Sequence, residues 1–222
     1  MAGLAGAESE RRRVTLTFDN GPTRGVTEAV LDVLARRGLR ATFFVVGARL
    51  ARPEVRALAE QAHAAGHWIG NHTLTHTVQF GRATDAAVDR EIDEAEAALD
   101  GLAHPDRLFR PYGAGGVIDH NLMSAHGRQR LIDGRFTCSL WNCLPRDWVD
   151  PDGWVDTCVE IVGTQPWSVV VVHDVATGAM RHLGRLIDRL DGIGVEWRQD
   201  LPDECTPIRR GVPTTSIDLL GV

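Results

Sequence analysis

The chain of 222 residues lacks several features that define large classes of protein. Its four cysteines form no CxxC pair, which argues against a cysteine-based metal or redox site and favours buried, reduced thiols. Basic residues are outnumbered by acidic ones, the formal net charge is -6, and the only basic cluster is Arg11, Arg12 and Arg13. Because nucleic acids and anionic membranes require a concentrated basic face, neither is an expected partner.

Long hydrophobic runs are also missing. No stretch approaches the roughly 18 apolar residues of a membrane span, and the first 13 residues lack the apolar segment of about 7–15 residues found in a secretory signal. There is no internal repeat, low-complexity segment or linker. The expectation is one cytoplasmic domain over residues 1–222, with 43% hydrophobic residues to build its core. The oligomeric state is left open.

Segments typical of strands and helices alternate along the chain. Apolar or alternating segments predict strands at 14–18, 41–46, 67–71, 107–110, 136–141, 168–172 and 194–198. Helical periodicity is found between them, at 26–37, 53–65, 84–99, 117–130, 155–162 and 180–190. The carboxylates of the helix at 84–99 are expected on its solvent side. After the core at 14–198, three prolines from Leu201 onward predict an irregular tail.

This alternation predicts an α/β fold. Seven strands separated by helices and short loops require about seven parallel strands joined by right-handed crossovers, with the helices outside. The residues themselves leave two architectures open, an incomplete (β/α) barrel and an open doubly wound sheet. In both, ligands bind at the C-terminal ends of the strands.

Polar side chains follow five of the predicted strands at that end. In chain order they are Asp19, Asn20, His72, His76, Arg110, Tyr112, Asp147, Trp148, His173 and Asp174. This convergence on one rim is typical of an active site.

The spacing of two histidines indicates a possible metal site. His72 and His76 are four residues apart in HTLTH, so a helical turn or tight loop would let both bind one ion, with an oxygen of Asn20 and water completing the sphere. A metal would lower the pKa of its bound water and polarise a carbonyl oxygen. Asp19 is then placed to take a proton from that water, and His173 to protonate an amine leaving group.

Each feature also has a simpler interpretation. The residues at 19–22, Asp-Asn-Gly-Pro, are good turn formers, and two histidines without a third ligand are compatible with ordinary polar residues. Arg110 and Asp147 could form a buried ion pair, and His173 could be a histidine at a strand end. Their joint placement on one rim favours the catalytic interpretation.

From Val14 to about Trp197 the sequence resembles the polysaccharide deacetylases of carbohydrate esterase family 4, which contain the nodulation-type deacetylase domain. The resemblance rests on five segments in the family's order: TFDNGP, HTLTH, FRPYG, WNCLPRDW and VVH. It implies a distorted (β/α) barrel and a hydrolase of carbon-nitrogen bonds other than peptide bonds. It also implies one divalent metal ion, zinc ahead of cobalt or nickel.

The resemblance assigns a role to each matching residue. These are Asp19 as general base, Asn20, His72 and His76 as the metal site, Arg110 as the group that holds Asp19, Tyr112 as oxyanion donor through its backbone N–H and as a pocket residue, Asp147 as the residue that orients His173, Trp148 and Val171 as pocket walls, and His173 as general acid.

Three positions depart from the family pattern. Asn20 replaces the second aspartate of the first motif, so the ion loses a carboxylate, which weakens its binding but leaves it more positively charged. The FRPYG segment is one residue shorter than the usual two-proline form, and Gly115 and Gly116 give its loop freedom to adjust. Val171 replaces a leucine.

The functional hypothesis is therefore a metal-dependent amide hydrolase. An N-acetyl group on a sugar or on a small metabolite is the leading substrate, so the expected partner is a small molecule or an oligosaccharide. One alternative is a ureide or cyclic imide hydrolase of the same fold. Another is a pseudoenzyme that binds a glycan or metabolite without turnover, which the substitution at Asn20 motivates.

Overall fold

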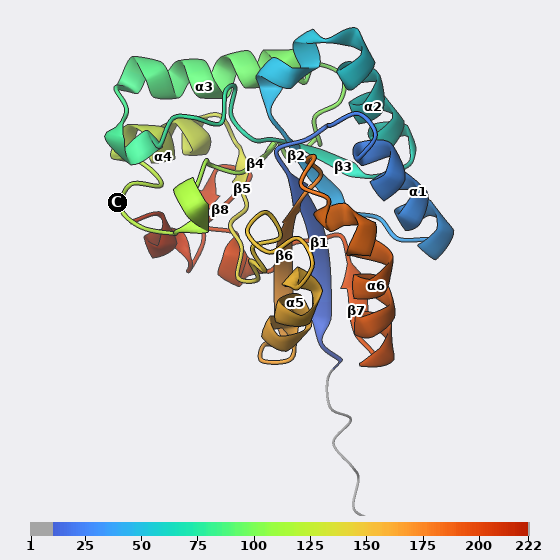
Figure 1. Cartoon of the computed structure of the whole chain (residues 1–222). Helices are drawn as coiled ribbons and strands as arrows, with labels where there is room; N and C mark the ends of the chain where they lie inside the picture. Colours follow the sequence, from blue (N-terminus) through green and yellow to red (C-terminus); the bar gives the residue numbers. More distant parts are fainter. Residues whose placement is uncertain (1–10, 222) are drawn as a thin grey trace, which may run out of the picture.

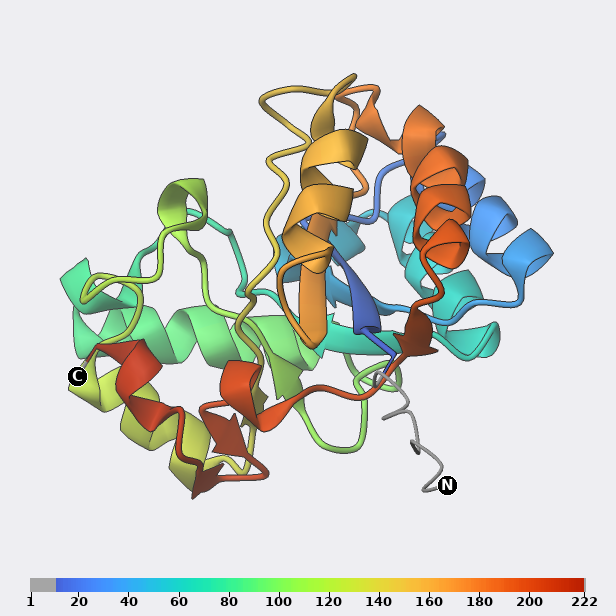
Figure 2. The same cartoon turned by 90° about the horizontal axis from the view of Figure 1, so that it is seen from below.

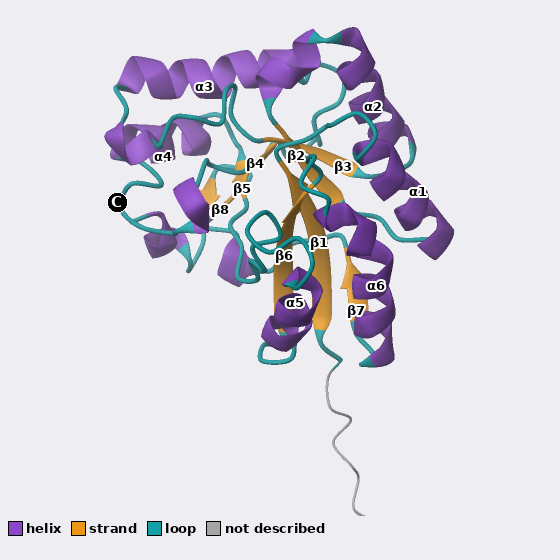
Figure 3. Ribbon diagram, in the orientation of Figure 1, coloured by secondary structure: helices purple, strands orange, loops and turns teal. Residues whose placement is uncertain are grey.

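A computed structural model describes residues 11–221 of the chain, so the expectation that the first residues carry no signal segment lies largely outside the described part. The fold is built on one curved sheet with helices outside it (Figure 1, Figure 3). The strands are β1 (Arg13–Asp19), β2 (Thr42–Val45), β3 (Trp68–Asn71), β4 (Leu108–Phe109), β5 (Thr137–Cys138), β6 (Trp167–His173), β7 (Glu196–Arg198), β8 (Ile208–Arg209) and β9 (Val212–Pro213). The helices are α1 (Thr27–Arg37), α2 (Pro53–Ala64), α3 (Asp85–Ala98), α4 (Ala125–Asp133), α5 (Trp154–Val162) and α6 (Leu183–Gly192). Along residues 11–221, no helix combines the length and apolarity needed to cross a bilayer.

The expected α/β class is confirmed. The sheet order is β6-β1-β2-β3-β4-β5-β8-β9, strands β1 to β7 pair in parallel, and β7 lies against the start of β1. The curl brings the segment after β5 back toward β6, where Cys143 forms an isolated parallel bridge with Val170. The result is a distorted, incompletely closed barrel.

The central strands are buried on both faces because helices cover the outside and packed side chains fill the inside. In β1, Val14, Leu16 and Phe18 are at most 1% exposed, and residues 169–172 of β6 are at most 2% exposed. One core joins β1, β2 and β6 to α1, α5 and α6, and a second lies under α3 and α4. These two cores fix the strand ends, and with them the polar residues that follow.

The predicted helix at 117–130 is wrong at both ends. Helix α4 begins at Ala125, and the side chain of Ser124 caps it by accepting a hydrogen bond from the backbone N–H of Gly127. Gly127 therefore lies in the first turn instead of interrupting the helix. The preceding residues turn through Asp119, whose carboxylate accepts from both the backbone and the side chain of Asn121.

The tail is more regular than the sequence predicts. Strand β8 pairs antiparallel with β5, and β9 pairs back on β8 through a turn at Arg210 and Gly211, both with positive φ. Ile208 is fully buried and extends the second core. Figure 2 shows this C-terminal segment, in red, beside α4. The tail therefore covers the edge of β5, which would otherwise be unpaired.

Candidate active site

A cavity of about 310 Å³ opens at the C-terminal ends of the parallel strands. Eight of the residues predicted for the site line it. They are Asp19, Asn20, His72, His76, Tyr112, Trp148, Val171 and His173. The other two predicted residues, Arg110 and Asp147, are fully buried behind the cavity, where each binds one of the lining residues. Segments from the whole length of the chain therefore meet at one place.

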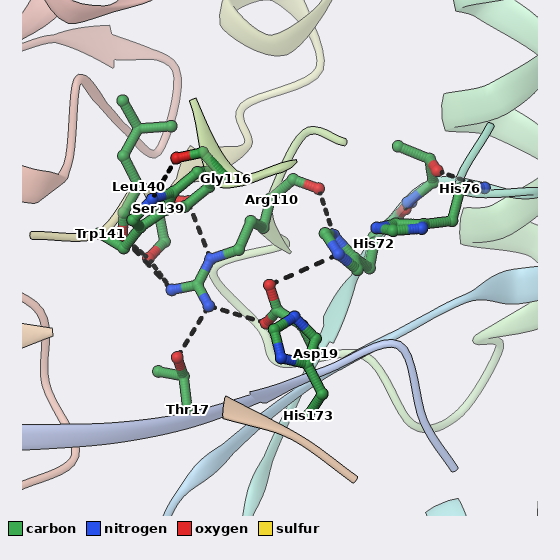
Figure 4. A network of polar contacts seen from close by, with 12 residues as sticks. Thr17, Asp19, His72, His76, Arg110, Gly116, Ser139, Leu140, Trp141 and His173 are labelled. Atoms are coloured by element: carbon green, nitrogen blue, oxygen red, sulfur yellow. Dashed lines mark hydrogen bonds and ion pairs between the residues drawn. The ribbon is translucent and has the colours of Figure 1, made fainter. Parts of the chain in front are cut away.

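Arg110 holds Asp19 from behind (Figure 4). Its Nη1 donates to Oδ1 of Asp19 at 2.8 Å and to Oγ1 of Thr17 at 2.7 Å. Its other nitrogens donate to the carbonyl oxygen and hydroxyl of Ser139, at 3.2 Å and 2.9 Å, and the ring of Phe44 lies 4.0 Å from the guanidinium carbon. A buried guanidinium with this many partners keeps its charge and fixes the orientation of the carboxylate.

The charges around Asp19 decide its protonation state. Burial alone would raise the pKa of Asp19, but the positive charge of Arg110, with smaller contributions from His72 and His173, holds that pKa below its usual value. Oδ1 is occupied by Arg110, while Oδ2 lies 3.4 Å from Nε2 of His72. Asp19 is therefore an ionised carboxylate with one oxygen directed toward the histidines.

The two histidines of HTLTH are neighbours in space. Their ring centroids are 4.6 Å apart, and Figure 4 shows the rings side by side. Nδ1 of His72 donates to the backbone carbonyl of Arg110 at 2.8 Å, which leaves Nε2 as the nitrogen with a free lone pair. Burial is the largest cause lowering the pKa of both rings, for His76 to about 3. Both imidazoles are therefore neutral, the form that binds metals.

The loop between these histidines is held in an unusual backbone conformation. Thr73 and His76 have φ of 64° and 57°, a region that is uncommon for residues other than glycine and rare for a β-branched residue such as Thr73. The side chain of Asn71 accepts a hydrogen bond from the N–H of Thr73, and the carboxylate of Glu91 accepts from both the N–H and the hydroxyl of Thr75. The expectation that the carboxylates of this helix all face solvent is wrong for Glu91, which is buried under the loop.

His173, at the end of β6, forms a second charged pair. Its Nδ1 donates to Oδ1 of Asp147 at 2.8 Å, and its backbone N–H donates to Oδ2 at 3.0 Å. Burial lowers the pKa of His173, but the hydrogen bond and charge of Asp147 outweigh burial and raise that pKa above 6.5. The indole of Trp148 lies edge-on against the imidazole, 4.8 Å between centroids. Asp147 thus favours the protonated form of His173, which lines the cavity with Trp148.

The side chain of Asn20 has a feature that suits a cation ligand. Its backbone is left-handed, with φ of 73°, which Asn tolerates better than most residues. Its Oδ1 is buried and has no hydrogen-bond partner within residues 11–221. Buried polar atoms are nearly always paired, so this oxygen fits a role as ligand to a cation. Within the described residues, no three His, Cys, Asp or Glu side chains are arranged to hold a metal ion.

The remaining walls of the cavity come from the loop after β4 and from β6. The ring of Tyr112 packs edge-on against His76, 4.3 Å between centroids, and no acceptor within the described chain pairs with its backbone N–H. Gly115 and Gly116 have φ of 66° and 77°, which lets this loop turn back over the cavity. Val171 of β6 also lines the cavity.

Asp174 lies directly after β6 and packs against the turn that follows β1. It is fully buried, its Oδ2 accepts from Oγ1 of Thr27 at 2.5 Å, and that hydroxyl accepts from the N–H of Thr23. A Cβ at Gly21 would overlap the Asp174 carboxyl, so the turn after β1 packs directly on it. Burial raises the pKa of Asp174 to about 7. This carboxyl ties the end of β6 to the turn that follows β1.

Known proteins share both the sequence and the fold. The family profile described as polysaccharide deacetylase matches residues 6–129. The chain is 33% identical over 173 residues to a chitooligosaccharide deacetylase of Rhizobium leguminosarum bv. trifolii, covering 76% of this chain and 74% of that one. It is 34% identical over 175 residues to one of Bradyrhizobium sp. (strain ANU 289), with the same coverage of 76% and 74%. It superposes with a TM-score of 0.72 on a family 4 carbohydrate esterase from Streptomyces lividans in complex with acetate, at 28% identity over 88% of this chain and 96% of that one.

Proposed function

Because the chain belongs to the polysaccharide deacetylase family and its relatives at 33–34% identity are named deacetylases, we propose that it is a metal-dependent N-deacetylase of an N-acetylated sugar or small metabolite. The names of its relatives, chitooligosaccharide deacetylases, support this substrate class. The observation that carries the proposal is the pairing of Asp19 with His173 on adjacent strands, beside His72, His76 and Asn20.

Asn20, His72 and His76 are the residues proposed to hold one divalent ion. Two neutral imidazoles and an amide oxygen suit zinc, and cobalt or nickel accept the same donors. The bound ion supplies a Lewis acid for the amide carbonyl and lowers the pKa of water. The carbonyl of Arg110 supports this role by fixing the tautomer of His72.

Asp19 is the proposed general base. Since Arg110 binds Oδ1, the free Oδ2 is the atom that accepts the proton of the attacking water. The same ion pair keeps Asp19 deprotonated at neutral pH. A positioned base of this kind contributes about 10²–10⁴-fold to a rate.

His173 is the proposed general acid. Asp147 binds Nδ1, so the proton given to the departing amine comes from Nε2 on the cavity side of the ring. An amine leaves poorly unless it is protonated, which makes this transfer necessary for an amide substrate. The raised pKa of His173 favours the protonated form that a general acid requires.

Tyr112 and the aromatic walls are proposed to position the acyl group. The unpaired backbone N–H of Tyr112 is available to donate to the developing oxyanion. The indoles of Trp141 and Trp148, both of which line the cavity, offer flat apolar faces to a sugar ring.

Product analysis of the zinc-loaded protein with N-acetylated chitooligosaccharides tests the proposal. Release of acetate and of a free amine in equal amounts supports deacetylation, whereas turnover of ureides or cyclic imides without acetate contradicts it.

The presence of Asn20 in place of the aspartate of the first motif favours a non-catalytic binding protein as the second candidate. That candidate predicts no hydrolysis by the metal-loaded wild type and gain of hydrolysis by Asn20→Asp.

A further inference from the structure

Two of the four cysteines lie against each other in the first core. Sγ of Cys143 and Sγ of Cys158 are 3.8 Å apart, and both side chains are fully buried. Cys143 belongs to the segment that bridges to β6, and Cys158 lies in α5. Cys138 and Cys205 are also buried, but within the described chain neither makes a sulfur-sulfur contact.

We propose that Cys143 and Cys158 form a disulfide bond when the chain folds in the presence of a disulfide donor, and that this bond clamps the loop carrying Asp147 and Trp148. An S–S bond is about 2.05 Å long, so the sulfurs have to approach each other by about 1.8 Å. Rotations about the side-chain torsions of the two cysteines and a shift of α5 are the movements that the bond requires. The bond does not depend on the proposed deacetylation.

The reaction is a thiol-disulfide exchange. One cysteine thiolate attacks a sulfur of the donor, such as oxidised glutathione or a protein disulfide, and forms a mixed disulfide while one donor thiol leaves. The second cysteine displaces the other donor thiol. The two cysteines lose two protons and two electrons, and the donor gains them as two thiols.

The bond is expected to form during folding and not afterwards. The hydrogen bond with Cys143, together with burial, raises the pKa of the Cys158 thiol well above 9, so Cys158 is almost entirely a thiol in the folded protein, and burial closes both sulfurs to a donor. Before α5 packs against β6, both thiols are open to the donor. In the cytoplasm expected from the sequence the pair stays reduced, whereas an oxidising compartment closes it.

The crosslink encloses the loop that supports the proposed acid. The two cysteines are 15 positions apart, and Asp147 lies between them with both carboxylate oxygens bound to His173. Closing a loop of this length is expected to raise the Tm of a chain of this size by about 6–12 °C. This stabilisation acts mainly by restricting the unfolded chain around the loop that carries Asp147.

The test is to refold the full, reduced chain with and without a glutathione redox buffer. We expect the oxidised sample to lose two of its four thiols, to give a Cys143–Cys158 crosslinked peptide in a non-reducing digest, and to melt about 6–12 °C higher than the reduced sample. Cys143→Ser should abolish the crosslink and the shift, whereas Cys138→Ser should keep both.

Other outcomes overturn the proposal. Four free thiols after oxidative refolding, or a crosslink that involves Cys138 or Cys205, would show that the contact is only apolar packing. A Cys143–Cys158 crosslink without a change in Tm would rule out the clamp. The peptide map of the wild-type chain decides the pairing even if a variant fails to fold.

Discussion

Asp19 and His173 occupy directly paired positions at the C-terminal ends of β1 and β6. Neighbouring strands are about 4.8 Å apart, so the two side chains rise from the sheet next to each other. Each is held from behind by a buried partner of opposite charge, Arg110 for Asp19 and Asp147 for His173. The fold thus places on one cavity a carboxylate whose pKa is lowered and an imidazole whose pKa is raised, and the predictions below follow from this pairing.

Replacing the proposed base by its amide should stop turnover while leaving the metal in place. Asn at position 19 keeps the shape of the side chain but cannot accept a proton, so kcat should fall by about 10²–10⁴-fold. Steady-state kinetics and metal content of Asp19→Asn check this, with the surface variant Asp200→Asn as the control. A rate within threefold of wild type would exclude Asp19 as the base.

The proposed acid should matter only for poor leaving groups. His173→Gln should reduce hydrolysis of an N-acetyl amide by about 10²–10⁴-fold, because the amine must be protonated as it departs. Hydrolysis of an activated aryl acetate, whose leaving group needs no proton, should fall by less than about tenfold. Equal losses on both substrates would mean that His173 acts in some other way.

The pH dependence of kcat/KM should show the effect of Asp147 on the pKa of His173. Asp147 raises the pKa of His173, so activity that needs the protonated ring is present at lower pH and is lost as pH rises through a value above 6.5. Asp147→Asn removes that charge and should move the alkaline limb of kcat/KM to lower pH. If the alkaline limb lies at the same pH in the variant, it does not arise from the titration of His173.

The buried ion pair should be costly to break. Arg110→Met leaves Asp19 buried without a counter-charge, and such losses destabilise proteins by about 3–5 kcal/mol. Urea unfolding measures the effect, and the double variant with Asp19→Asn should recover part of it, since the uncompensated charge is gone. A loss below about 1 kcal/mol for Arg110→Met alone would show that the pair is not the main support of this site.

Most of the architecture and the location of the site could be predicted from the sequence, because long apolar strands and helices have strong periodicity. Strands β1 and β6 and the helices around them were predicted within a few residues. The weak elements were harder to predict. Strands β4 and β5 contain only two residues each, fewer than the predicted segments 107–110 and 136–141 around them, whereas the tail strands β8 and β9 stand beside prolines and were not predicted. They form because the second core buries side chains from these segments and because neighbouring strands pair with their backbones.

The supports behind the site could not be predicted in the same way. Glu91 lies on a helix rich in carboxylates, and only the packing of α3 under the HTLTH loop distinguishes it from its exposed neighbours. The positive φ of Thr73 depends on Asn71 and on that same packing. Ser124 was a usable signal, since serine is a preferred helix N-cap, and it places the start of α4 correctly.

The central claim is that a cation held by Asn20, His72 and His76 is needed for cleavage of an amide at this cavity. The most direct measurement combines elemental analysis of the purified protein with acetate release from an N-acetylated chitooligosaccharide, before and after chelation. We expect about one divalent ion per chain, acetate release that stops on chelation and returns with zinc, and a folded His76→Ala variant without metal or activity. Full activity in the metal-free protein, or a stoichiometric ion retained by His76→Ala, would contradict the account.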